Sequence, residues 1–148
     1  MKNSLTKNAV LLAVMALVVS GGLMIAGCSS SDDAPDSLFT IWQLQEFVLD
    51  DGTTTPVDDP VKYTVEFRTD NTAAIRADCN NCNGPFSADD ENLSFGLMAC
   101  TIAACPPGSF DTQFQAALST VSSFEITPNL LLDYDGGTMR FIPQPTLF

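Results

Sequence analysis

The segment from Val61 to Asp78, VKYTVEFRTDNTAAIRAD, alternates apolar and polar side chains on both sides of a polar turn. Successive side chains of a β-strand point to opposite faces, so a period of two is typical of a strand with one buried face. Two such runs joined by Thr-Asp-Asn predict an antiparallel hairpin. The side chains expected on its buried face are Tyr63, Val65, Phe67, Ala73, Ile75 and Ala77. This face must be covered by further strands or by a helix.

Other stretches predict further strands. TIWQLQEFVLDDG, centred on Trp42, is rich in strand-forming residues and ends at a turn. A second hairpin is expected around the polar turn 89–92, with Phe86 and Phe95 on its two arms. A short strand within SFEIT precedes a last hairpin, in which NLLLDY and TMRFI flank the turn Asp-Gly-Gly. The chain therefore contains about seven or eight strands in antiparallel hairpins.

The apolar period changes in GSFDTQFQAALSTVSSF, residues 108–124. Here apolar side chains recur at steps of four, four and three, which places them on one face of a helix. We expect three to four turns, with Ser109 or Asp111 as the N-cap. The apolar face of this helix comprises Phe110, Phe114, Leu118 and Val121.

Together these elements predict one α+β domain over residues 38–148. The apolar stripe of the helix needs a cover, and the economical arrangement is a strongly bent antiparallel sheet, or incomplete β-barrel, with the helix packed on it. A domain of this size buries about two-thirds of its unfolded surface. An all-β sandwich is the alternative if the helix is shorter than expected.

The first 27 residues indicate an export signal. Lys2 and Lys7 precede an apolar run and a small-residue exit, a pattern typical of secretory signals. IAGC, residues 25–28, resembles the bacterial lipobox, which implies cleavage before Cys28 and acylation of its sulfur. We therefore expect a lipoprotein signal peptide over residues 1–27 and an acylated cysteine with a flexible tether over residues 28–37. An uncleaved helical anchor is the alternative.

The expected location is the cell envelope. Several acyl chains on one cysteine hold a protein stably on a bilayer. Ser29 follows the cysteine instead of aspartate, and by resemblance to enteric lipoproteins this favours the outer membrane, facing the periplasm. Without Lys2 and Lys7, four basic residues remain against eighteen acidic ones, a net charge of −14. Such a surface repels nucleic acid, which we therefore do not expect as a partner. The expected partners are the membrane, through the acyl anchor, and an envelope protein. We expect the protein to be a monomer.

The sequence contains no histidine, which excludes Ser-His-Asp and Cys-His catalysis and the common histidine-containing zinc sites. It also lacks G-x-S-x-G, P-loop and G-x-G-x-x-G motifs. The acidic clusters LDDG, VDDP and DDEN lack the ligand spacing of an EF-hand loop. We therefore expect a protein that is not an enzyme, with no catalytic residue, no cofactor and no metal site.

Five cysteines are an odd number for an exported protein, and acylation of Cys28 would explain the odd one. The other four, Cys79, Cys82, Cys100 and Cys105, could form a C-x-x-C redox centre, a tetracysteine zinc site or two disulfides. A redox C-x-x-C normally begins a helix, whereas CNNC here leaves a strand, and a zinc tetrathiolate would have to survive oxidation.

Hairpin register favours a nested pair of disulfides, Cys79–Cys105 and Cys82–Cys100. Residue numbers of opposite positions in an antiparallel pair have a nearly constant sum. The nested pairs come closer to the sum for Phe86 and Phe95 than the crossed pairs do. Closing the longer loop would stabilise the fold by about 3–4 kcal/mol in the chain-entropy model.

Residues 38–143 contain several short motifs: a tryptophan in the first expected strand, a Y-x-x-x-F segment, a C-N-x-x-x-G-x-aromatic segment and a T-x-x-A-C segment. Their residues are Trp42, Tyr63, Phe67, Cys79, Asn80, Gly84, Phe86, Thr101, Ala104 and Cys105. Together these motifs resemble the META/HslJ-type domain of bacterial envelope lipoproteins. Asp78 and Ala103 stand where that family has a glycine before C-N and a methionine in T-x-M-A-C.

The resemblance implies a bond between Cys79 and Cys105, onto which the family cysteines map, with Cys82 and Cys100 as an addition. It implies a stress-linked role in the envelope without an established reaction. For Asn80 and Gly84 we expect a role in turn geometry, because asparagine tolerates and glycine prefers left-handed backbone.

Two functions follow as hypotheses. The first is a lipid-anchored, non-enzymatic envelope protein whose disulfide-stapled domain acts in stress tolerance through protein contacts. The second is a carrier of a small apolar ligand or lipid, in a barrel cleft lined by Phe67, Phe86, Phe95 and the helix. Aromatic side chains at strand spacing more often fill a core, which favours the first hypothesis.

Overall fold

The computed structural model describes residues 34–145. The predicted signal peptide, residues 1–27, the acylation site Cys28 and the tether up to residue 33 lie outside the described residues. A short 3-10 turn, η1 (Asp36–Leu38), begins two residues before the predicted start of the domain. None of the helices between residues 34 and 145 has the length and apolar character that crossing a membrane requires.

Strands account for most of the regular secondary structure in the described chain, and two short 3-10 turns and one α-helix interrupt them. The second 3-10 turn is η2 (Pro60–Lys62). The remaining elements are β1 (Ile41–Leu49), β2 (Thr54–Pro56), β3 (Tyr63–Phe67), β4 (Thr72–Ala77), β5 (Asn80–Ala88), β6 (Leu93–Phe95), β7 (Ala99–Cys100), α1 (Asp111–Leu118), β8 (Ser123–Ile126), β9 (Leu130–Tyr134) and β10 (Gly137–Pro143).

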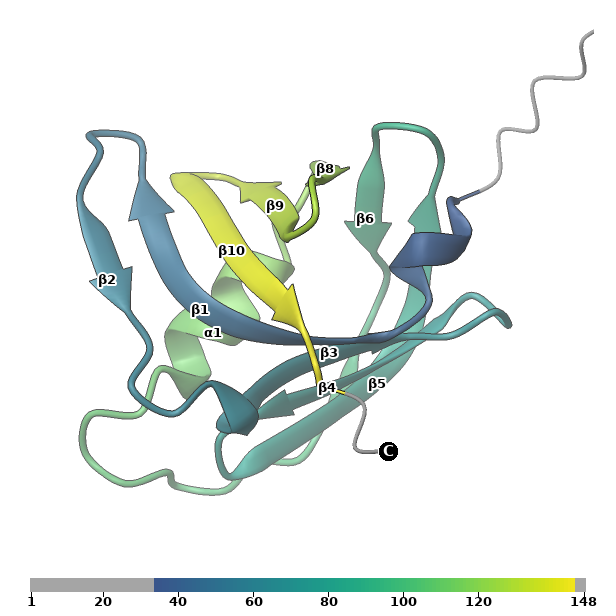
Figure 1. Cartoon of the computed structure of the whole chain (residues 1–148). Coiled ribbons are helices and arrows are strands. Elements are labelled where there is room, and N and C mark those ends of the chain that lie inside the picture. The colour runs from purple at the N-terminus through teal and green to yellow at the C-terminus, as the bar shows by residue number, and fades with distance from the viewer. Residues whose placement is uncertain (1–33, 146–148) are drawn as a thin grey trace, which may run out of the picture. The chain divides into compact units, whose positions relative to one another are not determined.

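Eight strands form one antiparallel path in the order β6-β5-β4-β3-β1-β10-β9-β8, while β2 pairs with β1 and β7 with β5. The two ends of this path approach each other, because the Leu93 N–H donates to Ser122 O at 3.2 Å and the Phe124 N–H to Glu91 O at 3.0 Å. The sheet is thus a nearly closed barrel with a single helix (Figure 1). This confirms the predicted α+β fold and excludes the sandwich.

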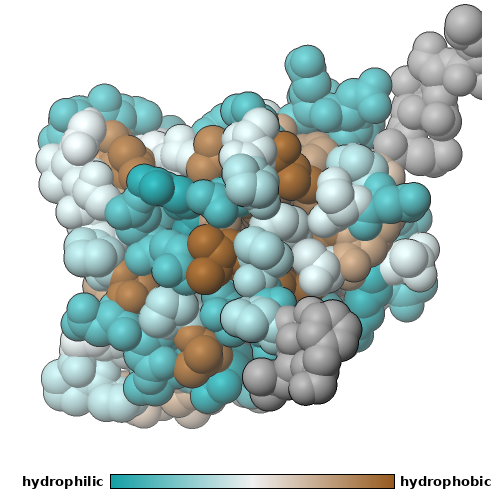
Figure 2. Space-filling view, viewed as in Figure 1, coloured by the Kyte–Doolittle hydropathy of each residue, from teal (hydrophilic) through white to brown (hydrophobic). Residues whose placement is uncertain are grey.

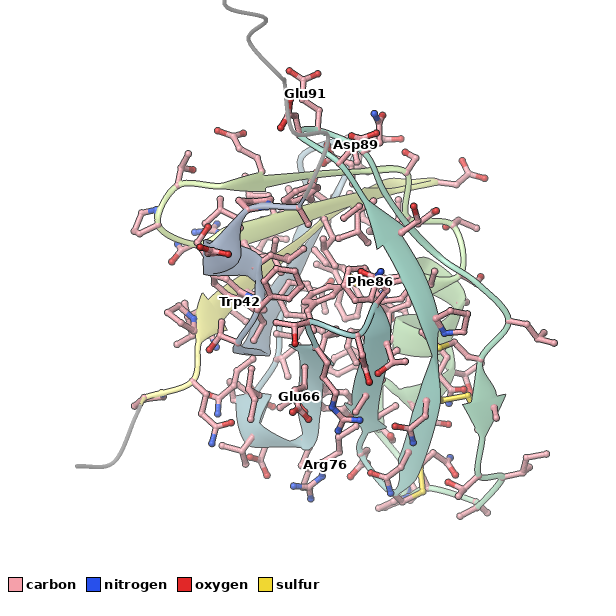
Figure 3. The ribbon with its side chains drawn as sticks, turned by 90° about the vertical axis from the view of Figure 1, so that its right-hand side faces the viewer. Trp42, Glu66, Arg76, Phe86, Asp89 and Glu91 are labelled. Atoms are coloured by element: carbon pink, nitrogen blue, oxygen red, sulfur yellow. A yellow bond between two sulfur atoms is a disulfide. The ribbon has the colours of Figure 1, made fainter. Side chains whose placement is uncertain are left out.

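The predicted hairpin faces are confirmed. Along β3, Tyr63, Val65 and Phe67 are buried, while the residues between them are not. Phe86 lies opposite Phe95 in the β5–β6 pair, as expected. Trp42 and Phe86 both point into the interior of the barrel (Figure 3). The interior is therefore filled by side chains.

The helix is shorter than predicted. It covers eight residues, Asp111–Leu118, or about two turns instead of three to four. Beyond it, Thr120 and Val121 donate their N–H groups to carbonyls three residues back, which tightens the chain into a turn. The Thr120 hydroxyl also bonds to Ala117 O. Such side-chain bonds to the backbone compete with helix continuation in the segment STVSS.

The start of α1 also differs from the prediction. Phe110 occupies the N-cap position, and no side chain caps it there. Ser109 Oγ accepts the Asp111 N–H at 3.2 Å, while the Tyr63 hydroxyl accepts the Phe110 N–H at 2.9 Å. The beginning of the helix is thus positioned by β3, a contact that local sequence does not contain. Phe114 then packs edge-on against Tyr63, which directs the helix into the barrel.

Candidate functional site

Two disulfides join the segment 96–105 to β5 and to the residue that precedes it. They are Cys79–Cys105 and Cys82–Cys100, which is the nested arrangement that hairpin register favoured. Cys82 lies directly opposite Cys100 in the short β5–β7 pair. With all four sulfurs bonded, neither a redox dithiol nor a zinc tetrathiolate is present. Among residues 34–145, no three cysteine or acidic side chains gather where they could hold a metal ion.

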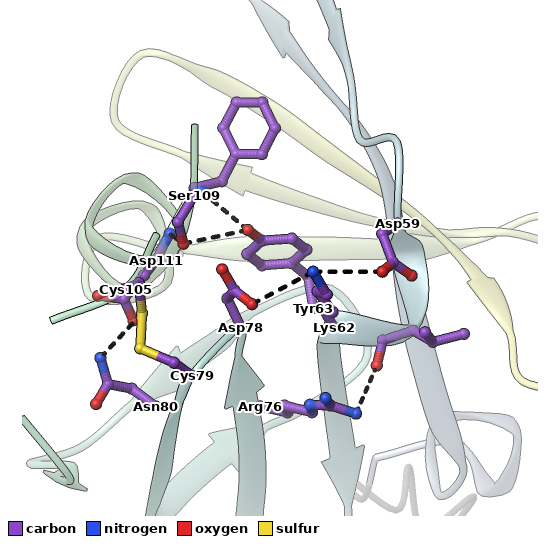
Figure 4. A network of polar contacts seen from close by, with 12 residues as sticks. Asp59, Lys62, Tyr63, Arg76, Asp78, Cys79, Asn80, Cys105, Ser109 and Asp111 are labelled. Atoms are coloured by element: carbon purple, nitrogen blue, oxygen red, sulfur yellow. Dashed lines mark hydrogen bonds and ion pairs between the residues drawn. A yellow bond between two sulfur atoms is a disulfide. The ribbon is translucent and has the colours of Figure 1, made fainter. Parts of the chain in front are cut away.

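Asn80 holds the same segment through its side chain. Its Oδ1 accepts the Ala103 N–H at 2.8 Å and the Thr101 hydroxyl at 3.1 Å. Its Nδ2 donates to Ala103 O at 3.1 Å and approaches Cys105 Sγ at 3.5 Å (Figure 4). Asn80 is buried, so these bonds satisfy an amide that would otherwise be costly to desolvate. This arrangement explains why Asn80 and Thr101 belong to one sequence signature.

The expected role of Asn80 and Gly84 in turn geometry is wrong. Both lie within β5, and neither has a positive φ. The residue with left-handed backbone is Asp78, at φ 54°, where the family pattern has its glycine. Gly84 serves close packing instead, because a Cβ there would lie 2.5 Å from Met98 Sδ and 2.8 Å from Leu97 O.

An apolar groove of about 290 Å³ opens beside the Cys82–Cys100 disulfide. Its walls come from β4, β5, the connection from β6 to β7, and α1. Most of the lining side chains are apolar. The groove is lined by Ile75, Cys82, Phe95, Gly96, Leu97, Met98, Cys100, Gln115, Leu118 and Ser119.

The predicted ligand cleft is correct only in part. Phe95 and Leu118 of the helix line the groove, but Phe67 and Phe86 do not. These two rings are buried and pack edge-on with their centroids 4.9 Å apart. Phe67 also stacks on Phe95 at 5.8 Å, so the floor beneath the groove is closed by aromatic rings.

Two large apolar side chains of the segment 96–105 project away from the protein. Leu97 is 94% exposed and Ile102 is 100% exposed. No charged residue occurs from Leu93 to Phe110, although the chain has eighteen acidic residues elsewhere. On the face seen in Figure 2, by contrast, apolar residues are scattered among polar ones. We call Leu97, Ile102 and the uncharged residues between them the apolar ridge.

A polar network around Lys62 and Asp78 has a structural role. Lys62 lies 3.5 Å from Asp59 and 3.8 Å from Asp78, and Arg76 donates to Val61 O at 3.2 Å (Figure 4). These contacts hold η2 against the end of β4. Each charged group there has a partner within the domain.

A family model described as META domain matches residues 36–146, three-quarters of the chain. The chain belongs to the META domain family. The match begins at the residue where η1 begins. In this META domain Trp42 of the signature is buried, and its Nε1–H donates to Leu38 O at 3.0 Å, which closes the first turn onto β1.

Two solved structures are similar to this META domain. A protein from Burkholderia xenovorans, solved by NMR, is 25% identical with a TM-score of 0.61; the match covers 80% of this chain and 97% of that one. A DUF4847 family protein from Bacteroides vulgatus, solved by crystallography, is 15% identical with a TM-score of 0.52, over 76% and 97% of the two chains. The second likeness concerns the fold alone. No curated protein matches the chain.

The solved proteins consist almost wholly of the matched domain, since 97% of each is covered. This fold therefore forms without further chain in both of them. In the present protein, the described residues, 34–145, likewise belong to one compact unit.

Proposed function

We propose that this META domain is the body of a lipid-anchored, non-enzymatic envelope protein that acts through protein contacts made by the apolar ridge. The observation that carries the proposal is the nearly complete exposure of Leu97 and Ile102 on a backbone held by two disulfides. Apolar side chains in such positions gain free energy only when a partner covers them.

The ridge suits a protein partner for two reasons. Its backbone is held in place before binding, by the disulfides and by Asn80, so little conformational entropy is lost on association. Its lack of charge means that no ion needs to be desolvated when it is covered. The acidic remainder of the domain then favours partners with uncharged or basic surfaces around the contact.

The proposed lipid anchor and envelope location rest on residues 1–29 and are supported by the disulfides of the domain. Disulfides persist in oxidising compartments such as the periplasm. The lipobox-like IAGC supplies the acylation site Cys28, and Ser29 favours the outer membrane. The mass of the protein isolated from cells tests this. We expect an acylated fragment beginning at Cys28 and a gain of two hydrogens per disulfide on reduction.

The non-enzymatic role is supported by the polar groups around the ridge. The side chains of Asn80 and Thr101 form hydrogen bonds with each other and with the backbone, so they have a structural role. The absence of histidine from the chain removes the usual general base at neutral pH. A stress-tolerance role is the expectation that family resemblance contributes.

In-cell crosslinking tests the contact. A photo-crosslinking residue replaces Ile102 in one variant and Gln113 in another. Both positions are exposed, but Gln113 belongs to α1 and not to the ridge. We expect crosslinked protein adducts from position 102 and few from position 113. Equal yields at both positions, or none at position 102 in membranes that contain the protein, would contradict the proposal.

A second candidate function is the carriage of a small apolar ligand. The groove of about 290 Å³ favours it, because this volume lies near the lower end of the range for small-molecule sites. Native mass spectrometry of protein isolated from the envelope is the direct test. We expect a co-purified small molecule that is released on unfolding.

A further inference from the structure

Gln115 contributes an amide group to the otherwise largely apolar lining of the groove. It projects from α1 and is half-buried among the apolar lining. Its Nε2 lies 2.6 Å from Asp111 Oδ1, one helical turn earlier. A carboxylate accepts hydrogen bonds and does not donate them, so the amide must present its N–H₂ group to Asp111. The orientation of the Gln115 amide is thereby determined.

The Oε1 atom of Gln115 consequently points the other way, toward the disulfide wall of the groove. Its nearest polar neighbour is Cys82 Sγ at 3.5 Å. This sulfur is bonded to Cys100 and carries no hydrogen, so it cannot donate to Oε1. Within residues 34–145 no other side chain or backbone group donates to this oxygen. The groove therefore combines a largely apolar lining with an amide oxygen, Gln115 Oε1, that has no donor within the described residues.

The other lining groups indicate the rest of the ligand. Phe95 offers a ring for aromatic contact, and Met98 and the disulfide offer sulfur, which packs well against aromatic rings. The volume admits only a compact molecule.

We propose that the groove binds a compact ligand with an apolar body and one hydroxyl group, of which a phenol is the simplest example, and that this hydroxyl donates to Gln115 Oε1. The proposal rests on the second candidate function and names its ligand class. A purely apolar molecule would fill the groove but leave Oε1 without a donor. An anionic ligand would bring a charge that Oε1 repels.

The test compares p-cresol with toluene, which has the same ring and methyl group but no hydroxyl. Both are titrated into ¹⁵N-labelled residues 31–148 with the disulfides intact, and binding is followed through the amide signals of Gly96, Cys100 and Leu118. The proteins are wild type, Gln115→Met and Gln113→Met. Gln113 lies on the same helix but does not line the groove, so its variant is the matched control.

The quantity that decides is the affinity for p-cresol divided by the affinity for toluene. The difference in hydration between the two probes is the same for wild type and Gln115→Met. It therefore cancels when the two ratios are compared, and the remaining difference reports the hydrogen bond to Gln115. We expect the ratio to fall about three- to tenfold in Gln115→Met, as one net hydrogen bond predicts, and to stay unchanged in Gln113→Met. Gln115→Leu repeats the measurement if the methionine variant is misfolded.

The outcomes separate the two levels of the proposal. If both probes bind and the ratio is the same in wild type and Gln115→Met, the hydroxyl donor is wrong while the groove remains a ligand site. If neither probe shifts the groove signals, the groove does not bind small molecules and the second candidate function fails with it. A ratio that falls equally in both variants would also contradict the role of Gln115.

Discussion

The β1–β10 pair and the segment 96–105 are held in place by different means. β1 and β10 pair from Trp42 opposite Pro143 to Leu49 opposite Gly137. The segment 96–105 contributes only Cys100 and Ala99 to strand pairing. Phe47, Met139 and Phe141 of the first region are fully buried, whereas Leu97 and Ile102 of the second are almost fully exposed.

The difference shows two ways to order a chain. Where strands are long, burial of alternate side chains stabilises them at about 25 cal/mol per Å² of apolar surface. The segment 96–105 buries little, and covalent bonds and the Asn80 amide order it instead. Its apolar side chains are then not needed for the core and remain available for contact with other molecules.

The largest expected effect is in the β1–β10 region. Phe141→Ala removes a fully buried ring that faces Phe114, with centroids 6.2 Å apart. We expect a loss of about 3–5 kcal/mol in the free energy of unfolding, because the cavity cannot collapse completely. Urea denaturation measures it. Ile142→Ala, on the opposite face of the same strand, is the control, and equal costs for both variants would refute this account of the core.

The next largest effect on stability is expected from removal of the Cys79–Cys105 disulfide. Replacing Cys79 and Cys105 by serine together should cost about 3 kcal/mol, since the bond closes a loop with a sequence separation of 26. Hydrogen exchange locates the change. We expect the Thr101 amide, which donates to Asn81 O at 3.0 Å, to lose more protection than the amides of β10. An equal loss of protection in the segment 96–105 and in β10 would show that the disulfide does not order this segment separately from the rest of the sheet.

Asn80→Ala should cost less, about 1–3 kcal/mol, because the Ala103 N–H and the Thr101 hydroxyl lose their acceptor. Asn81→Ala is the matched control: the side chain of Asn81 is exposed and the change should stay within about 0.5 kcal/mol. Urea denaturation again decides. If the two variants cost the same, the Asn80 network does not hold the segment.

The smallest effect is a pH dependence at the β5–β6 turn. Backbone N–H groups of Asn92 and Glu91 and the Asn92 amide hold the pKa of Asp89 below its ordinary value of 3.8. The folded state then binds a proton on Asp89 more weakly than the unfolded state does. The stabilisation of the fold by ionised Asp89 is therefore present above pH 3.8, and it disappears as the pH falls through the lower pKa that Asp89 has in the folded state. Melting temperatures of wild type and Asp89→Ala should therefore converge toward pH 2. A difference between them that grows on acidification would reverse the sign and contradict the assignment.

Sequence patterning predicted the parts of this fold that are local or periodic. The alternation through Tyr63, Val65 and Phe67 determines the buried face of β3, and Phe86 and Phe95 set the register of their hairpin. The length of α1 was overestimated, because the period of its apolar residues continues to Val121 while the backbone turns away after Leu118. Periodicity reports which side chains are buried, and a turn can bury a side chain as well as a helix can.

The candidate site was predicted less completely. The nested disulfides followed from the register of one hairpin. The hydrogen bonds of the Asn80 side chain could not be predicted in this way. Its partners lie more than twenty residues further along the chain and include backbone groups that no motif encodes. For Gly84 the sequence predicts a role in backbone conformation, whereas its lack of a side chain makes room for Met98 in the connection from β6 to β7.

The sequence by itself determined that this chain forms antiparallel hairpins with one helix, that its four domain cysteines lie close in register, and that it belongs with META domains. These features depend on neighbours in the chain or on hairpin partners, whose positions follow from strand geometry. Only the tertiary structure decided where the helix ends, what Asn80 and Gly84 contact, and that one disulfide-held segment contributes both to a groove and to an exposed ridge. Each of these arises where elements distant in sequence meet, and patterns along the chain contain no record of such contacts.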